Sequence, residues 1–164
     1  DRIGIRGPNG IGKSTLVRHL LPLFAEKSIR SWYLEQEMDL EQSLASYQAF
    51  ELLEPQVKGR IVSTVVRLGS NAQLFLLSAL PSPGELRKLL IAQALESNLS
   101  LLVLDEPTNH LDLPSRLALE TELRSFAGAL LLVSHDQDFL EQVCTTWWDL
   151  SYRPGSQNSE LLVH

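Results

Sequence analysis

A glycine-rich stretch near the start of the chain has the residue types and the spacing of a phosphate-binding loop. Residues 7–14 match the pattern G-x-x-x-x-G-K-[ST] at every defined position. Glycines let backbone N–H groups approach phosphate oxygens, and the N-terminus of a following helix attracts the same anion. We expect Lys13 to reach the β- and γ-phosphates of a nucleotide and Ser14 to bind Mg²⁺. The residues expected to hold the nucleotide are Gly7, Pro8, Asn9, Gly10, Ile11, Gly12, Lys13, Ser14 and Thr15.

A second candidate group consists of polar residues that directly follow apolar segments. Asp105 and Glu106 end the unbroken apolar run 101–104, while His135 and Gln36 lie just beyond two other apolar segments. Taken alone, each is also explained as the solvated end of a buried strand or as a surface residue. With a phosphate loop upstream, we expect Asp105 to support Mg²⁺ and Glu106 to accept a proton from an attacking water. The carboxyl ends of parallel strands meet at one edge of a sheet, so His135 and Gln36 could approach the same phosphate.

The elements that must position these residues alternate between strands and helices. Strands are expected at 2–6, 31–35, 100–105 and 129–134, with weaker ones at 146–150 and 160–163; helices are expected at 13–26, 85–95, 113–126 and 136–142. Pro22 is expected to bend or shorten the first helix. The stretch 39–80 has helical periodicity and predicts two or three helices without strands. This alternation predicts an α/β fold with a parallel sheet.

Composition limits the class of protein further. The 164 residues are 44% hydrophobic and 21% charged, which is typical of one globular domain. The longest apolar run, at 126–133, is far shorter than the roughly 20 residues that a membrane helix needs, so no direct membrane segment is expected. A single cysteine, Cys144, excludes an internal disulfide and a cysteine-based metal cluster, and fits a reducing, cytoplasmic compartment. The net charge of −6 argues against broad nucleic-acid binding.

The order of these motifs resembles the ATP-binding-cassette (ABC) ATPases over about residues 2–150. Within that superfamily, the segments 105–112 (Asp-Glu-Pro-Thr-Asn-His-Leu-Asp) and 134–140 (Ser-His-Asp-Gln-Asp-Phe-Leu) resemble the ABC-F subgroup. Transporter ATPases more often have Ser-Ala-Leu-Asp at positions 109–112. The resemblance implies a P-loop NTPase fold, α/β with a mainly parallel sheet flanked by helices and a helical insertion subdomain. It implies one partial ABC domain over 1–164, with a core at 1–38 and about 96–164 and a helical subdomain at about 39–95.

The resemblance also implies a role for each motif, with ATP and Mg²⁺ as the ligands. Glu106 corresponds to the catalytic base, His135 to the switch at the γ-phosphate, and Gln36 to a sensor of metal and water. The implied metal ligands are Ser14, Asp105 and Gln36. The signature loop (Ser82, Gly84 and Glu85) would act on the ATP of a partner cassette, and the D-loop (Asn109, His110, Leu111 and Asp112) would touch that cassette.

Two departures from the family pattern stand out. The signature loop reads Pro81-Ser82-Pro83-Gly84-Glu85, so Pro83 stands where a glycine is usual and has no N–H to donate. The ATP site that this loop completes in the partner cassette is expected to be weakened. The chain also begins one short strand before the phosphate loop. The N-terminal β-subdomain, which carries the aromatic residue that usually stacks on adenine, is therefore expected to be missing.

The leading functional hypothesis is one cassette of an ABC-F-type ATPase. Such a protein has two cassettes, in one chain or in a dimer, and acts on the ribosome through regions outside this chain, in translation control or antibiotic resistance. One alternative is the ATPase subunit of an ABC membrane transporter, whose partner is a membrane domain. Another is a clamp that binds ATP and hydrolyses it slowly, for which Pro83 is the motivating residue.

Overall fold

The chain divides into two compact units, each described here separately. The computed structural model describes residues 1–37, 39–77, 81–152 and 159–164. The P-loop unit consists of Asp1–Gln36, Leu99–Pro107 and Phe126–His164, and the helical unit consists of Glu37–Asn98 and Thr108–Ser125. The family resemblance implied a core at 1–38 and about 96–164; by its contacts, the segment Thr108–Ser125 groups with the helical unit.

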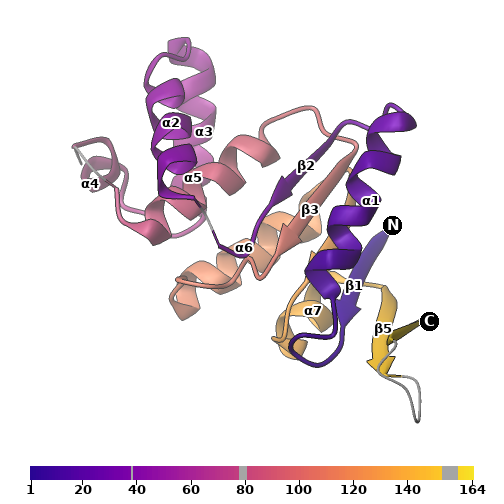
Figure 1. The fold of residues 1–164 in the computed structure, drawn as a ribbon. Helices are drawn as coiled ribbons and strands as arrows, with labels where there is room; N and C mark the ends of the chain where they lie inside the picture. The colour runs from indigo at the N-terminus through magenta and orange to yellow at the C-terminus, as the bar shows by residue number, and fades with distance from the viewer. Residues whose placement is uncertain (38, 78–80, 153–158) are drawn as a thin grey trace. The chain divides into compact units, whose positions relative to one another are not determined.

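The P-loop unit is built on a sheet whose order among the described residues is β2-β3-β4-β1-β5-β6 (Figure 1). The strands are β1 (Arg2–Arg6), β2 (Ser31–Leu34), β3 (Leu101–Asp105), β4 (Ala129–Val133), β5 (Thr146–Tyr152) and β6 (Ser159–Val163). The pairs from β2 to β5 are parallel, and β6 is antiparallel to β5. The predicted mainly parallel sheet is confirmed. Its parallel strands all end at one edge, where the candidate site residues follow.

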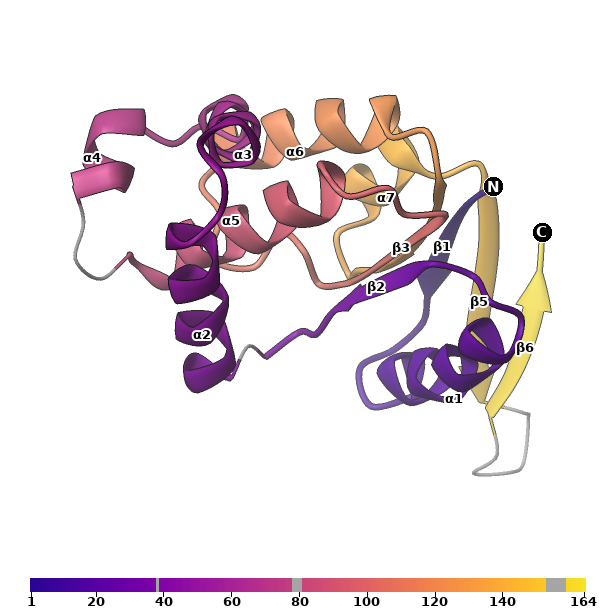
Figure 2. The same ribbon diagram turned by 90° about the horizontal axis from the view of Figure 1, so that it is seen from above.

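Helices α1 (Lys13–Glu26) and α7 (Gln137–Val143) lie on opposite faces of this sheet (Figure 2). Helix α1 continues through Pro22 to Glu26, so the proline does not shorten it. Beneath α1, alternate residues of the central strands form a core with Val17 that includes Val103 and Val133. Every residue of β3 is buried, which is the pattern of a strand covered on both faces. Burying one such Val or Leu side chain contributes about 1.5–3 kcal/mol.

The helical unit contains five helices among the described residues: α2 (Leu40–Glu51), α3 (Pro55–Arg67), α4 (Ala72–Leu77), α5 (Pro83–Leu95) and α6 (Leu113–Ser125). The first three fill the stretch in which two or three helices were expected; residues 78–80 of that stretch lie outside the described ranges. Helices α2 and α3 both pack against α5. An aromatic group of Tyr47, Phe50 and Phe75 joins α2 to α4, with ring centroids 6.0–6.3 Å apart.

The start of α5 shows how local sequence sets an element boundary. The Ser82 side chain accepts a hydrogen bond from the Glu85 N–H at 3.3 Å and so caps the helix. Pro83 then occupies the first helical position, where its fixed φ suits the helix and its missing N–H leaves no intrahelical bond unmade. The helix therefore begins two residues before the predicted start at Glu85.

Candidate nucleotide-binding site

The glycine-rich loop joins the end of β1 to the start of α1, as the motif predicts. Gly12 has φ 106° and directly precedes the helix. Gly7 has φ 150°, and a Cβ there would lie 2.6 Å from the Leu150 carbonyl oxygen of β5. Both positions therefore require glycine, one for its left-handed backbone and the other for close packing against the neighbouring strand. The loop is closed by a hydrogen bond from the Ile11 N–H to the Pro8 carbonyl oxygen at 3.3 Å, and it leads into the N-terminus of α1, which attracts anions.

The Lys13 ammonium lies inside this loop. Its side chain is largely buried, with 8% of the residue exposed. Nζ donates to the carbonyl oxygens of Gly7 at 2.8 Å and Pro8 at 3.2 Å. A buried charge needs such partners. The ammonium is thus held by backbone oxygens of the loop, where an entering phosphate oxygen would meet it.

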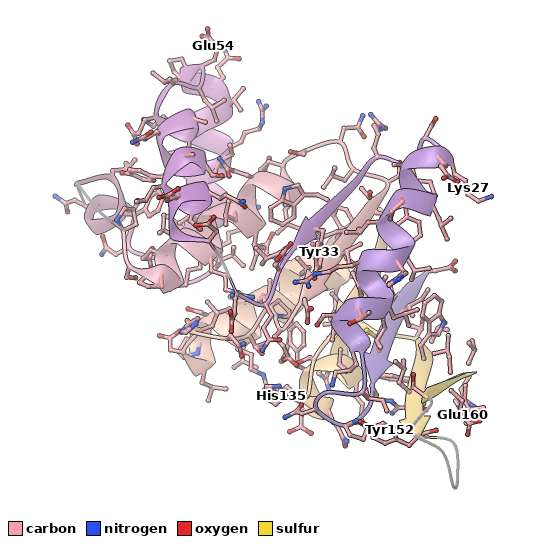
Figure 3. The ribbon with its side chains drawn as sticks, viewed as in Figure 1. Lys27, Tyr33, Glu54, His135, Tyr152 and Glu160 are labelled. Carbon is pink, nitrogen blue, oxygen red and sulfur yellow. The ribbon has the colours of Figure 1, made fainter. Side chains whose placement is uncertain are left out.

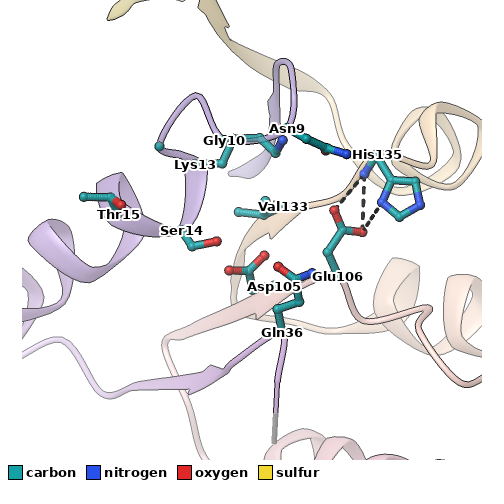
Figure 4. Close-up of a pocket in the computed structure, with 11 residues that line it drawn as sticks. Asn9, Gly10, Lys13, Ser14, Thr15, Gln36, Asp105, Glu106, Val133 and His135 are labelled. Atoms are coloured by element: carbon teal, nitrogen blue, oxygen red, sulfur yellow. Dashed lines mark hydrogen bonds and ion pairs between the residues drawn. The ribbon is translucent and has the colours of Figure 1, made fainter.

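The loop forms one wall of a cavity of about 480 Å³ at the carboxyl edge of the sheet (Figure 4). The other lining residues lie at the ends of β2, β3 and β4 or within two residues after them. The cavity is lined by Asn9, Gly10, Gly12, Lys13, Ser14, Thr15, Gln36, Asp105, Glu106, Val133 and His135. Six of these were predicted to bind the nucleotide, three (Gln36, Glu106 and His135) to act in catalysis, and Asp105 to bind the metal; Val133 was not predicted.

Asp105, at the end of β3, is the most deeply buried carboxylate of the cavity, with 1% of the residue exposed. Burial raises its pKa, while hydrogen bonds from the hydroxyls of Ser14 and Tyr33 act in the opposite direction. The Tyr33 Oη donates to Oδ2 over 3.3 Å. Burial, reinforced by the charge on Asp105, raises the pKa of Tyr33 to about 12, so this hydroxyl keeps its proton at neutral pH.

The oxygen donors around Asp105 suit a small, hard cation. Ser14 contributes a hydroxyl, Asp105 a carboxylate and Gln36 an amide oxygen, and Figure 4 shows the three side chains grouped on one side of the cavity. Oxygen ligands of this kind are those that Mg²⁺ takes, together with waters and substrate phosphates. The donor set therefore fits the predicted Mg²⁺.

Glu106 is held by the segment that follows β4. Its carboxylate accepts hydrogen bonds from the His135 backbone N–H at 3.1 and 3.3 Å and from the Ser134 hydroxyl at 3.1 Å. His135 Nδ1 lies 2.9 Å from Oε2 (Figure 4). Glu106 itself has φ 48°, a left-handed conformation that is rare for a residue with a side chain. Its side chain lines the cavity.

The signature and D-loop residues lie in the helical unit, where they contact each other. A Cβ added to Gly84 would lie 2.9 Å from the carbonyl oxygen of His110, so the signature glycine packs directly on the D-loop backbone. His110 has φ 64°, within a turn closed by the Leu111 N–H on the Thr108 carbonyl at 3.1 Å. Asp112 caps α6 by accepting the Ser115 N–H at 3.0 Å. Asp112 therefore has a local structural role besides the one predicted for it.

Sequence reasoning missed two hydroxyls beneath the carboxylates. Tyr33 contacts Asp105 from the edge strand β2, and Ser134 links the Asp136 N–H to Glu106. The sequence signal for these hydroxyls was their proximity to predicted site residues: Tyr33 lies three positions before Gln36, and Ser134 directly precedes His135. Ile11 is 5% exposed and its side chain packs in the hydrophobic core, so the nucleotide contact predicted for it would be made by its backbone.

Comparison with known proteins identifies the family. A model of the ABC transporter family matches residues 1–109. The chain belongs to the ABC transporter family. ABC transporter F family member 2 of Arabidopsis thaliana is 34% identical over 156 residues, which cover 87% of this ABC chain and 23% of that protein. Ribosome protection protein VmlR of Bacillus subtilis (strain 168) is 38% identical over 152 residues, which cover 87% of this chain and 28% of that protein.

A solved structure agrees with these relatives. The structure of RNase-L Inhibitor superposes with a TM-score of 0.70 at 26% identity and covers 99% of this ABC chain and 34% of its own. The predicted resemblance to ABC ATPases, and among them to F family members, is confirmed, as is the P-loop fold. The chain spans about a quarter of the length of the curated relatives it matches. None of the helices in its described part combines the length and apolar character needed to cross a bilayer.

Proposed function

We propose that this ABC chain is the ATP-binding and ATP-hydrolysing part of an ABC-F-type protein. The observation that carries the proposal is the meeting of Lys13, Ser14, Asp105 and Glu106 in one cavity, at the edge where the parallel strands end. Backbone N–H groups and Lys13 bind the phosphates, and Ser14 and Asp105 hold Mg²⁺, with Gln36 close by. Mg²⁺ supplies positive charge where the phosphoryl group becomes more negative.

In this proposal Glu106 acts as the general base. One of its carboxylate oxygens accepts a proton from a water molecule as that water attacks the γ-phosphorus of ATP. The bond from the γ-phosphorus to the β,γ-bridging oxygen then breaks, which gives ADP and phosphate. His135 contacts Glu106 through both its backbone N–H and Nδ1, so it orients the base. By family resemblance, His135 is also the switch at the γ-phosphate. Catalysis of this kind rests on positioning and on stabilisation of charge.

A second cassette would complete the site. By family resemblance, the signature loop at the start of α5 caps the γ-phosphate held by the partner cassette, and the D-loop touches that cassette. The N-terminus of a helix is suited to this, because its free N–H groups stabilise developing negative charge. Pro83 removes one of those donors, so we expect slower hydrolysis at the partner site than a glycine at this position would allow.

We further propose that the full-length protein works on the ribosome in the cytoplasm, in translation control or antibiotic resistance. The support is the similarity to VmlR, which is named a ribosome protection protein, and to an F family member of Arabidopsis. The contacts with the ribosome would be made by regions outside this chain.

The test is ATP turnover of the full-length protein in membrane-free buffer, with and without ribosomes. We expect turnover that ribosomes stimulate, and its loss in the variant Glu106→Gln, which should still bind ATP. Glu141→Gln is the matched control, because Glu141 is exposed on α7 and does not line the cavity. This variant should turn over ATP like the unmodified protein. Turnover indifferent to ribosomes would contradict the ribosomal role and favour a transporter subunit. Tight ATP binding without turnover would contradict hydrolysis and favour a clamp.

A further inference from the structure

We propose that Tyr33 is a positioning residue for the metal-binding carboxylate: its hydroxyl holds the Asp105 side chain in the orientation that Mg²⁺ requires. The proposal rests on the proposed function, because it assigns Asp105 to the metal that accompanies ATP. Tyr33 belongs to none of the motifs that define the phosphate loop, the acidic strand end or the switch segment.

The first support is the position of Tyr33 in the sheet. It lies on β2, an edge strand, and is paired in register with Val103 of β3, two residues before Asp105. Its ring packs against the core cluster that includes Val17 of α1. From this anchored ring the hydroxyl reaches along the sheet to Oδ2 of Asp105, at 3.3 Å. Figure 3 shows Tyr33 on the strand beside α1, above the region of His135.

The second support is the hydrogen bonding of Asp105. Tyr33 donates to one carboxylate oxygen, Oδ2, while Ser14 from the first turn of α1 lines the same cavity as Asp105. The bond from Tyr33 restricts rotation of the carboxylate about its Cβ–Cγ bond. A carboxylate fixed in this way presents its oxygens to a cation without losing rotational freedom when the cation binds. Residues that orient a metal ligand commonly change metal affinity by about 10- to 100-fold when they are removed.

The third support separates the hydroxyl from the ring. Phenylalanine would fill the same volume in the core, since it differs from tyrosine by one oxygen. Tyr33 is partly buried, and its hydroxyl donates to the carboxylate that ends β3, inside the cavity. Packing alone therefore accounts for an aromatic residue at position 33, while the bond to Asp105 accounts for the oxygen.

The test measures metal-dependent nucleotide binding rather than turnover. Full-length protein carrying Tyr33→Phe is titrated with Mg²⁺ in the presence of a fluorescent, non-hydrolysable ATP analogue. We expect half-saturation at a Mg²⁺ concentration about 10-fold higher than for the unmodified protein. Binding of the analogue in EDTA should be unchanged. Tyr152→Phe is the matched control, because it removes the same hydroxyl from a residue that is about half exposed on β5. Strands β4 and β1 separate β5 from β3, which carries Asp105.

The outcomes separate the inference from the proposed function. Coincident Mg²⁺ titrations of Tyr33→Phe and the unmodified protein would overturn the role of Tyr33. An equal loss of affinity with Mg²⁺ and in EDTA, accompanied by a lower melting temperature, would also overturn it, because that pattern belongs to a purely structural residue. If the unmodified protein bound the analogue without any response to Mg²⁺, the assigned metal site itself would be wrong, and the proposed function would fail with it.

Discussion

Two glycines of the helical unit should respond in opposite ways to the same substitution. Gly59 lies within α3, and a Cβ there would meet nothing within 4 Å. Gly59→Ala should therefore raise the free energy of unfolding by about 0.5–1 kcal/mol, since alanine loses less backbone freedom on folding. Gly84 lies in the first turn of α5, and its added Cβ would sit 2.9 Å from the carbonyl oxygen of His110. The shift that this contact forces costs about 1–3 kcal/mol, which exceeds the helix gain.

Urea unfolding followed by far-UV circular dichroism is the suitable assay. The three tryptophans, Trp32, Trp147 and Trp148, all lie in the P-loop unit, so their fluorescence would report the other part of the chain. We expect the midpoint to rise for Gly59→Ala and to fall for Gly84→Ala, with the slopes unchanged. Equal stabilisation by both variants would refute the reasoning, because it would mean that the signature loop does not pack on the D-loop.

Three further predictions concern the P-loop unit. Asp105→Asn should abolish turnover yet stabilise the protein free of nucleotide and metal by about 0.5–2 kcal/mol at pH 7. Burial raises the pKa of Asp105, so ionisation of this carboxyl destabilises the unmodified protein as the pH rises. The stabilisation by Asp105→Asn should therefore vanish below about pH 4, as measured by urea unfolding. Ser134→Ala should lower the free energy of unfolding by about 1–2 kcal/mol, because the Asp136 N–H and Glu106 each lose a partner. Turnover should fall several-fold while the affinity for ATP stays the same. Unchanged turnover would contradict a role for the hydrogen bond from Ser134 to Glu106. Burial raises the pKa of the Cys144 thiol to about 12, so iodoacetamide should label native protein at pH 8 far more slowly than urea-unfolded protein.

The sequence predicted the elements around the phosphate loop closely. Strand β1 and helix α1 have the predicted bounds, and β3 and β4 differ by one residue at one end. These elements are defined by apolar runs, a glycine-rich turn and helical periodicity, all of which are local signals. The cavity was predictable for the same reason, since parallel strands must end at a common edge.

What the sequence could not predict depends on contacts between distant residues. Tyr33 and Asp105 are 72 positions apart, and Ser134 and Glu106 are 28 apart, so only the folded sheet brings each hydroxyl to its carboxylate. The same holds for α6, whose grouping with the helical unit follows from packing rather than from its place in the chain. The start of α5 differs from the prediction for a different reason, because Pro83 and Gly84, which are poor residues for a helix interior, form its first turn.

The position of Lys13 also affects how readily the loop can empty. With its ammonium bound to the carbonyl oxygens of Gly7 and Pro8, the ligand-free loop holds no unsatisfied buried charge. A phosphate that enters exchanges one set of partners for another, and a phosphate that leaves returns the ammonium to the carbonyls. The Lys13 ammonium therefore has partners whether or not a phosphate is bound, so the departure of product does not leave a buried charge without partners. Such a loop is suited to repeated cycles of binding and release rather than to permanent retention of one ligand.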